Sequence, residues 1–333
     1  MPLSASRELR VTIERLPIAG EFRISRGSKT EAVVVVAEID DGGVVGRGEC
    51  VPYARYGETV EGVAEAIREL APRIGTGGID RFALRGALPP GAARNALDCA
   101  LWDLEAKLTG VPVWQSAGLD AAPGPVTTCY TLSIDTPERM GVAAGGCGRP
   151  VLKLKLAGDG ADLDRVRAVR QGAPGARLIV DANEGWTLED LTRLAPLFAD
   201  LGVEMIEQPL PASADDALLG FTSPVPLGAD ESAHGLDSLE RIQGKYAVVN
   251  IKLDKTGGLT EALEMKEACA AAGLDVMVGC MVATSLAMAP AFLLAQGARF
   301  VDLDGPLLLA RDRPDGLGYD GGTVHPPTPA LWG

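Results

Sequence analysis

Six charged residues each lie at the end of an apolar run in the second part of the chain: Lys155, Asp181, Glu207, Asp230, Lys252 and Asp302. The first five follow one another at intervals of 22 to 26 residues, and the last interval is about twice as long. One strand and one helix fill such an interval. In a barrel of parallel strands, the C-terminal strand ends share one rim, where catalytic groups gather. The spacing therefore predicts that these side chains meet at one barrel mouth.

Three of these residues, Asp181, Glu207 and Asp230, are carboxylates from consecutive predicted strands. Mg²⁺ prefers carboxylate oxygens and keeps other positions for water or substrate. The alternative is that each carboxylate only caps the next helix. The regular spacing favours a shared site for one Mg²⁺ per subunit, with Asn183 and Glu231 as partners that orient the ligands.

Lysines are the candidate acid–base groups. Lys153 and Lys155 are two residues apart, so in a strand they project from the same face. Helices cover the outside of a barrel, so we expect this face to be the lumen. Neighbouring ammonium groups and a metal ion would lower a lysine pKa toward the range of a general base. Lys252 lies four strands further on and so roughly opposite Lys155, although it could also be a solvated residue at a strand end.

The elements that must position these groups are eight short apolar runs. They are expected at 126–133, 151–156, 177–181, 204–207, 226–230, 248–252, 275–279 and 300–302. Helix-like sequence follows each of them except the last. Strands that alternate with helices indicate a parallel sheet, and eight of them a closed α/β barrel, here expected over residues 121–304.

Residues 1–120 have a different sequence pattern, which is typical of an α+β unit. Strands are expected at 10–17, 31–40 and 44–49, and helices at 59–71, stopped by Pro72, and 92–108. The tail, residues 305–333, is rich in Gly and Pro, and we expect it to complete this unit. No catalytic cluster is apparent in it.

Composition excludes several classes of function. The net charge is −14, from 31 Lys and Arg against 45 Asp and Glu, which argues against a nucleic-acid partner. Two histidines, His234 and His325, leave little room for a His-rich zinc site or a Ser-His-Asp triad, although His234 lies four residues after Asp230. No signal peptide or membrane-length apolar run is visible, and the six scattered cysteines favour reduced thiols and a cytoplasmic location, with Cys280 a candidate pocket residue.

Several motifs together resemble those of one family. They are KLK at 153–155, DAN at 181–183, EQP at 207–209, ADES at 229–232 and NIKLDKTGG at 250–258. With them, the chain resembles the enolase superfamily in its muconate-lactonizing subgroup. The resemblance implies a modified (β/α)7β barrel of the TIM type with an N-terminal α+β capping domain. It also implies Mg²⁺-dependent removal of a proton next to a carboxylate.

The pair Asp302 and Asp304 resembles the D-x-D of the dipeptide epimerases, where it binds the α-ammonium of the substrate. The closest likeness is to the L-Ala-D/L-Glu epimerases of murein-peptide recycling. In these enzymes a basic residue of the capping-domain loop meets the glutamate side chain, which implies Arg26 here, and Thr131 is a further candidate for the pocket.

The resemblance implies a dipeptide substrate whose terminal carboxylate meets Mg²⁺. Lys155 and Lys252 would then exchange the α-proton of its second residue between two faces, assisted by Lys153. Three alternatives stay open: an epimerase for other dipeptides, a lyase related to o-succinylbenzoate synthase or muconate cycloisomerase, and a metal-binding barrel without activity. The seventh strand carries no histidine, which excludes the racemases with a His base. We also expect a homo-oligomer.

Overall fold

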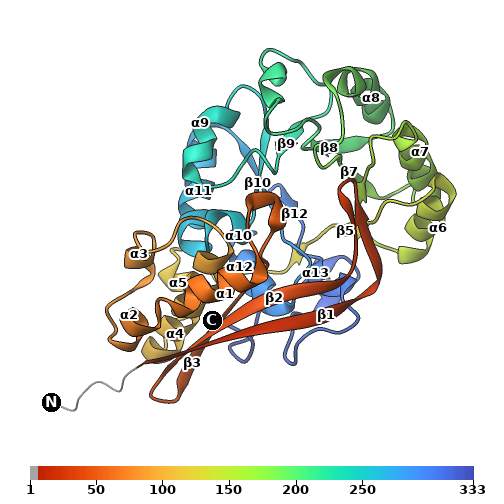
Figure 1. Cartoon of the computed structure of the whole chain (residues 1–333). Coiled ribbons are helices and arrows are strands. Elements are labelled where there is room, and N and C mark those ends of the chain that lie inside the picture. The colour runs from red at the N-terminus through yellow and green to blue at the C-terminus, as the bar shows by residue number, and fades with distance from the viewer. Residues whose placement is uncertain (1–6) are drawn as a thin grey trace.

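The computed structural model describes residues 7–333 of the chain. Figure 1 shows a barrel ringed by helices and a smaller N-terminal unit beside it. A long ribbon of two strands runs from this unit to the barrel, and the C-terminus lies against the N-terminal unit.

The N-terminal unit is an antiparallel three-stranded sheet covered by helices. Its strands are β1 (Glu8–Ile24), β2 (Gly27–Asp41) and β3 (Val44–Cys50). Its helices are η1 (Ala54–Tyr56), α1 (Val60–Arg68), α2 (Ala71–Gly75), α3 (Arg81–Leu84), α4 (Ala92–Thr109) and α5 (Val113–Ser116). Alternate residues of β2 face α4 and form a separate apolar core with it, as the period of a strand requires. A Cβ at Gly48 would lie 2.1 Å from the carbonyl oxygen of Ala96, so only glycine allows α4 to lie this close to β3.

The first two strands are much longer than the sequence predicted. The first strand was expected to end at residue 17 and the second to begin at residue 31, but the two stay paired as far as Ile24 and Gly27. Arg26 therefore lies in the tight turn of a two-stranded ribbon. The ribbon bends where the register shifts after Pro17, and the backbone N of Ala310 donates to the carbonyl oxygen of Pro17 there. Pro72 also differs from expectation, because it lies in the first turn of α2, where a missing N–H costs nothing.

Eight strands form the barrel sheet in sequence order. They are β5 (Tyr130–Leu132), β6 (Val151–Lys155), β7 (Arg177–Asp181), β8 (Val203–Glu207), β9 (Leu227–Ala229), β10 (Val248–Ile251), β11 (Asp275–Val278) and β12 (Phe300–Val301). All neighbours are parallel. A hydrogen bond of 2.9 Å from Cys129 N, just before β5, to Val301 O of β12 links the last strand to the first. The expected barrel is confirmed.

Helices connect most of these strands: α6 (Pro137–Cys147), α7 (Asp162–Gly172), α8 (Leu188–Asp200), η3 (Leu236–Ser238), α9 (Leu239–Ile242), α10 (Leu253–Thr256), α11 (Leu259–Ala271) and α12 (Ser285–Leu294). Between β8 and β9 the sequence predicted a helix, but only η2 (Asp215–Leu218) forms. No helix within residues 7–333 is long and apolar enough to cross a membrane.

The tail contacts both parts of the molecule. It contains α13 (Gly305–Leu308), β13 (Tyr319–Asp320) and β14 (Thr323–Val324), and β14 pairs with β4 (Val126–Thr127) ahead of the barrel. Arg47 of β3 donates to the carbonyl oxygens of Ala330 and Leu331 (2.7 Å each), so the chain end lies on the N-terminal unit. The domain boundaries themselves stay a prediction.

The lumen of the barrel has an apolar layer below a charged one. The apolar layer contains Cys129, Val151, Ile179, Met205, Val248, Met277 and Phe300. Successive inward residues of a strand are two apart, so Asp181 lies above Ile179 and Glu207 above Met205. The charged residues found from their spacing therefore point into the barrel and not into solvent.

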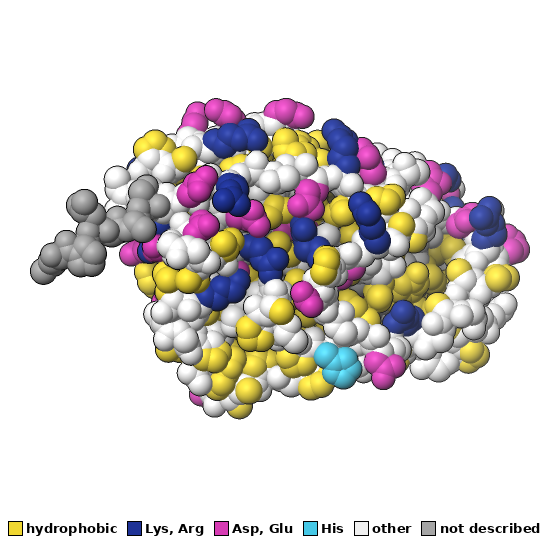
Figure 2. Space-filling view, turned by 90° about the horizontal axis from the view of Figure 1, so that it is seen from below, with side chains coloured by type: hydrophobic (Ala, Val, Ile, Leu, Met, Phe, Trp, Pro, Cys, Tyr) yellow, Lys and Arg dark blue, Asp and Glu magenta, His cyan; other side chains and the backbone are white. Residues whose placement is uncertain are grey.

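Charge on the outer surface is mixed. On the face shown in Figure 2, basic and acidic side chains are interspersed with apolar ones between them. The acidic excess of the sequence is therefore not gathered into one patch on this face.

Candidate active site

Three buried carboxylates form the centre of the charged layer. One oxygen each of Asp181, Glu207 and Asp230 lies within 4.8 Å of the others. Asp181 and Glu207 end β7 and β8, and Asp230 directly follows β9. The three residues predicted from their spacing are thus brought together by adjacent strands.

The residues of this cluster fit a hard divalent cation. Three carboxylates from a rigid sheet are a ligand set suited to Mg²⁺. Two buried oxygens near the cluster, Asn183 Oδ1 and Glu207 Oε2, accept no hydrogen bond. Lys153 Nζ lies 2.8 Å from Glu207 Oε2 as an ion pair. Burial, and then the charge of Asp181, raise the pKa of Glu207 to about 7. Concentrated negative charge of this kind is relieved by a cation.

Lysines flank the carboxylates from different strands. Lys155 Nζ, at the end of β6, lies 2.5 Å from Asp181 Oδ2, and Lys252 Nζ, after β10, lies 2.7 Å from Asp230 Oδ2. Four steps around an eight-stranded barrel separate β6 from β10. The two ammonium groups therefore reach the same cavity from opposite walls, as the sequence predicted.

Lys153 is fully buried in the lumen. Its Nζ lies 2.8 Å from Glu207 Oε2 and 2.8 Å from Asp302 Oδ2. It therefore connects the carboxylate cluster to the D-x-D motif.

Carboxylates of the protein shift the pKa values of two of these lysines upward. Burial alone would lower the pKa of Lys153, but Asp302, Glu207 and Asp181 outweigh it and hold the pKa well above its usual value. The pKa of Lys252 is likewise raised, because Asp230 outweighs burial. The carboxylates responsible lie within ion-pair distance of the two ammonium groups, and the effect of a metal ion on the lysines stays a prediction.

Two buried residues that the sequence analysis missed hold the carboxylates in place. Lys255 Nζ donates to Asp230 Oδ1 (2.7 Å), Asp230 O (2.7 Å) and Asn250 O (2.8 Å). Asn250 Nδ2 donates to Glu207 Oε1 (2.7 Å). The sequence places this lysine and this asparagine in buried segments, β10 and α10. Because polar groups are rarely buried without a partner, they could have been predicted to contact the carboxylates.

The D-x-D pair lies across the cavity on the loop after β12. Asp302 pairs with Lys153 and accepts from the Cys129 thiol (3.1 Å). Asp304 Oδ2 accepts from the backbone N of Thr131 (2.6 Å). Burial, and then the charge of Asp302, raise the pKa of Asp304 to about 7. Both carboxylates are desolvated, which is the condition under which they would select a cation.

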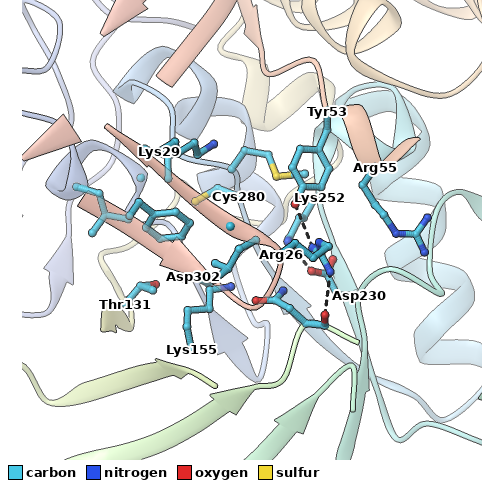
Figure 3. Close-up of a pocket in the computed structure, with 18 of the residues that line it drawn as sticks. Arg26, Lys29, Tyr53, Arg55, Thr131, Lys155, Asp230, Lys252, Cys280 and Asp302 are labelled. Atoms are coloured by element: carbon cyan, nitrogen blue, oxygen red, sulfur yellow. Dashed lines mark hydrogen bonds and ion pairs between the residues drawn. The ribbon is translucent and has the colours of Figure 1, made fainter. Parts of the chain in front are cut away.

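These groups line one cavity of about 490 Å³ between the barrel mouth and the N-terminal unit. Figure 3 shows Lys155 and Lys252 in it, with the ribbon that carries Arg26 and Lys29 across it. The candidate residues that line it are Arg26, Thr131, Lys153, Lys155, Asn183, Asp230, Glu231, Lys252, Asp302 and Asp304. Cys280, expected as a pocket residue, also lines it.

Arg26 is already engaged by the protein. It lies 2.7 Å from Glu231 Oε1 and donates to Asn183 O (2.9 Å) and to the Tyr53 hydroxyl (3.0 Å). Glu231 and Asn183 are the two predicted orienting residues, and Asn183 Nδ2 donates to Glu231 Oε1 (3.4 Å). Arg26 therefore joins the tip of the ribbon to the loops that follow β7 and β9.

His234 takes no place in this cavity. It lines a neighbouring one, and its ring lies edge-on to Tyr56 with the ring centroids 4.3 Å apart. Packing against Tyr56 accounts for the residue without a direct catalytic role.

Carboxylates lie at the mouth of this barrel, lysines flank them on opposite strands, and an α+β unit covers them. This arrangement defines a barrel enzyme of the enolase type. Residues 139–330 match the profile of the enolase C-terminal domain-like family, and residues 6–118 match that of the mandelate racemase / muconate lactonizing enzyme N-terminal domain. The chain belongs to the enolase superfamily.

Among its relatives, the chain is 45% identical to the L-Ala-D/L-Glu epimerase of Escherichia coli over 96% of this chain and 99% of that protein. It is 47% identical to the N-acetyl-D-glutamate racemase of a Pseudoalteromonas species, over 90% of this chain and 95% of that protein. A solved Agrobacterium tumefaciens enolase family member with homology to dipeptide epimerases, bound to sodium and L-Ala-L-Glu, superposes with a TM-score of 0.96 at 49% identity, covering 98% of this chain and all of that one. The dipeptide epimerase of Enterococcus faecalis, complexed with Mg and L-Leu-L-Tyr, gives 0.88 at 28% identity, covering 96% and 97%.

Proposed function

We propose that this protein is a Mg²⁺-dependent dipeptide epimerase that inverts the α-carbon of the C-terminal residue, with L-Ala-L-Glu and L-Ala-D-Glu as its substrate pair. The observation that carries this proposal is the placement of Lys155 and Lys252 on opposite walls beside the three-carboxylate cluster. Inversion at carbon requires a proton to leave one face and another to arrive at the opposite face, and two bases on opposite walls supply both steps.

Asp181, Glu207 and Asp230 would hold the cation, which supplies positive charge against the substrate carboxylate and so lowers the cost of negative charge next to the α-carbon. One of Lys155 and Lys252 takes the α-proton, and the other gives a proton to the opposite face. Lys153, whose pKa is raised, stays charged and adds positive charge to the same carboxylate.

Asp302 and Asp304 are the proposed site for the α-ammonium of the first residue. Their burial leaves little water to compete with a substrate cation. This disfavours the lyase alternative, because o-succinylbenzoate and muconate chemistry involves dianionic substrates without an ammonium group. The same acidic pair separates dipeptides from N-acyl amino acids, which keep the amide and lack the ammonium.

Racemisation of N-acetyl-glutamate is a second candidate, favoured by one observation. Lys153 already pairs with Asp302, and the pKa of Asp304 is about 7, so the D-x-D pair carries less free negative charge than two carboxylates would. The relative from Pseudoalteromonas carries this activity in its name. The predictions of a cytoplasmic location, of a homo-oligomer and of a role in murein-peptide recycling accompany the first candidate and stay predictions.

The experiment is exchange of the α-proton with ²H₂O for a panel of L-Ala dipeptides and N-acetyl amino acids, read by mass spectrometry. We expect exchange of L-Ala-L-Glu that EDTA abolishes and Mg²⁺ restores. Exchange of N-acetyl-glutamate in preference to every dipeptide would favour the second candidate, and exchange of neither would overturn the proposal.

A further inference from the structure

Three cations from the N-terminal unit line the cavity: Arg26, Lys29 and Arg55. Two of them are neutralised by the protein. Arg55 makes a two-pronged ion pair with Glu184 (2.7 and 2.8 Å), and Arg26 is held by Glu231 and by Asn183 O. A substrate carboxylate would have to share either guanidinium with a protein carboxylate.

Lys29 differs from the other two. Within residues 7–333 its ammonium group has neither an ion pair nor a hydrogen bond, and in Figure 3 dashed lines leave Arg26 but none leaves Lys29. Lys29 pairs in register with Phe22 on the ribbon, and both residues line the cavity. Burial, and then the charge of Lys155, lower the pKa of Lys29. A half-buried cation without a counter-ion favours binding of an anion.

Substrate geometry directs one group toward this ammonium. When the α-proton leaves, the α-carbon becomes planar, with the two lysines above and below the plane. Its carboxylate lies toward the metal cluster, and its amide nitrogen leads to Asp302 and Asp304. The third in-plane substituent is the side chain, which must leave through the remaining side of the cavity. The ribbon that carries Lys29 lines the cavity, and the side chain is placed against it.

We propose that Lys29 is the specificity-determining residue that binds the anionic side chain of the second substrate residue, and that Arg26 is a positioning residue that fixes the ribbon carrying Lys29. This inference rests on the proposed function. It changes the role that the family resemblance implied for Arg26. The ligand chemistry is a carboxylate at the end of a flexible side chain, as in glutamate.

The positioning role of Arg26 follows from what it connects. It lies in the two-residue turn between Ile24 and Gly27, and its guanidinium reaches Glu231, the residue after the metal-cluster carboxylate Asp230. Ser25 in the same turn donates to Asn183 O (3.1 Å). The turn is therefore fastened to two loops of the barrel mouth, and Lys29 follows three residues later.

The test compares kcat/KM for L-Ala-L-Glu with that for the neutral, nearly isosteric L-Ala-L-Gln. We expect Lys29→Gln to lower the Glu-to-Gln ratio by about 10- to 100-fold, the factor for losing a charge-assisted hydrogen bond, and to act mainly through KM. Lys29→Arg should keep the preference for glutamate, and Lys29→Glu should shift it toward L-Ala-L-Lys.

Two further variants separate contact from other effects. Arg23→Gln removes a cation from the same ribbon whose side chain is exposed and paired with Glu21, and it should leave the ratio unchanged. Arg26→Gln should lower kcat/KM for both dipeptides, and it should lower the Glu-to-Gln ratio less than Lys29→Gln does, because the ribbon loosens but the Lys29 ammonium is still present. The inference would be overturned if Arg26→Gln lost the preference for L-Ala-L-Glu over L-Ala-L-Gln while Lys29→Gln kept it.

Failure of the proposed function has a different signature. In that case the wild-type protein exchanges the α-proton of no dipeptide. If only N-acetyl amino acids react, the same variants are compared on N-acetyl-glutamate and N-acetyl-glutamine, and the same ratios decide the role of Lys29. Circular dichroism and melting temperatures would show that each variant is folded.

Discussion

Replacing Lys255 by methionine removes the buried support of one metal-cluster carboxylate. Lys255 is fully buried, and its three donors are all used, two of them by Asp230 and one by Asn250 O. Methionine has a similar length and no charge, so the change fills the space and removes the lysine donor from Asp230 Oδ1.

The cost follows from burial. Burial alone would raise the pKa of Asp230, but Lys252 and then Lys255 outweigh it and hold the pKa well below its usual value. Breaking a buried ion pair by removing one partner costs about 3–5 kcal/mol. Lys252 still pairs with Asp230, so we expect about 3 kcal/mol, at the lower end of that range.

The assay is chemical denaturation of both proteins with and without saturating Mg²⁺. We expect a smaller difference with Mg²⁺, because the cation gives Asp230 a positive partner again. Lys266→Met is the matched control. Among residues 7–333, the Lys266 ammonium donates to the carbonyl oxygens of Leu294 and Gln296 and to no carboxylate, so the change should cost about 1 kcal/mol. Equal costs for the two variants, or the same cost at Lys255 with and without Mg²⁺, would refute this reasoning.

Two other predictions concern buried carboxylates. Burial raises the pKa of Asp254 to about 7, and its Oδ1 accepts from Val51 N (3.0 Å) and Asn95 Nδ2 (2.8 Å). An aspartate has a pKa of about 4 when unfolded, so ionisation of Asp254 destabilises the fold progressively from about pH 4 to about pH 7. Asp254→Asn keeps both hydrogen bonds, so its melting temperature should rise relative to that of the wild type as the pH increases through this window. A difference in melting temperature that does not change with pH would contradict this prediction. Asp304→Asn should lower kcat/KM for L-Ala-L-Glu by about 10-fold or more while affecting N-acetyl-glutamate less, since only the dipeptide has an ammonium group, and equal losses would argue against the ammonium site.

Spacing along the sequence predicted much of the fold and of the candidate site. Regular intervals bring Asp181, Glu207 and Asp230 to the C-terminal ends of adjacent strands because strand and helix lengths repeat in a barrel. The period of two in a strand then fixes which side chains enter the lumen, as with Lys153 and Lys155. These are local rules, so one sequence suffices to apply them.

Contacts between distant segments could not be predicted in this way. Arg26 meets Glu231 only because the ribbon extends beyond its expected ends, and polar residues such as Glu21 and Ser28 hide that pairing from a hydrophobic pattern. Lys29 differs from the other cations because no described carboxylate contacts it. The absence of a counter-ion depends on all the segments that line the cavity, so it could not be predicted from the residues near Lys29. The pKa of Lys153 likewise depends on carboxylates from three other strands or loops.

The central claim is that two lysines on opposite walls exchange one proton at an α-carbon. It is tested most directly by incubating L-Ala-L-Glu with Mg²⁺ in ²H₂O and following L-Ala-D-Glu and its α-deuterium for the wild type, Lys155→Ala and Lys252→Ala. We predict that the wild-type product carries solvent deuterium at the α-carbon and that each variant, still folded, loses epimerisation by about 10³-fold or more. Full epimerisation by either variant, or a product that retains its original proton, would contradict the two-base account.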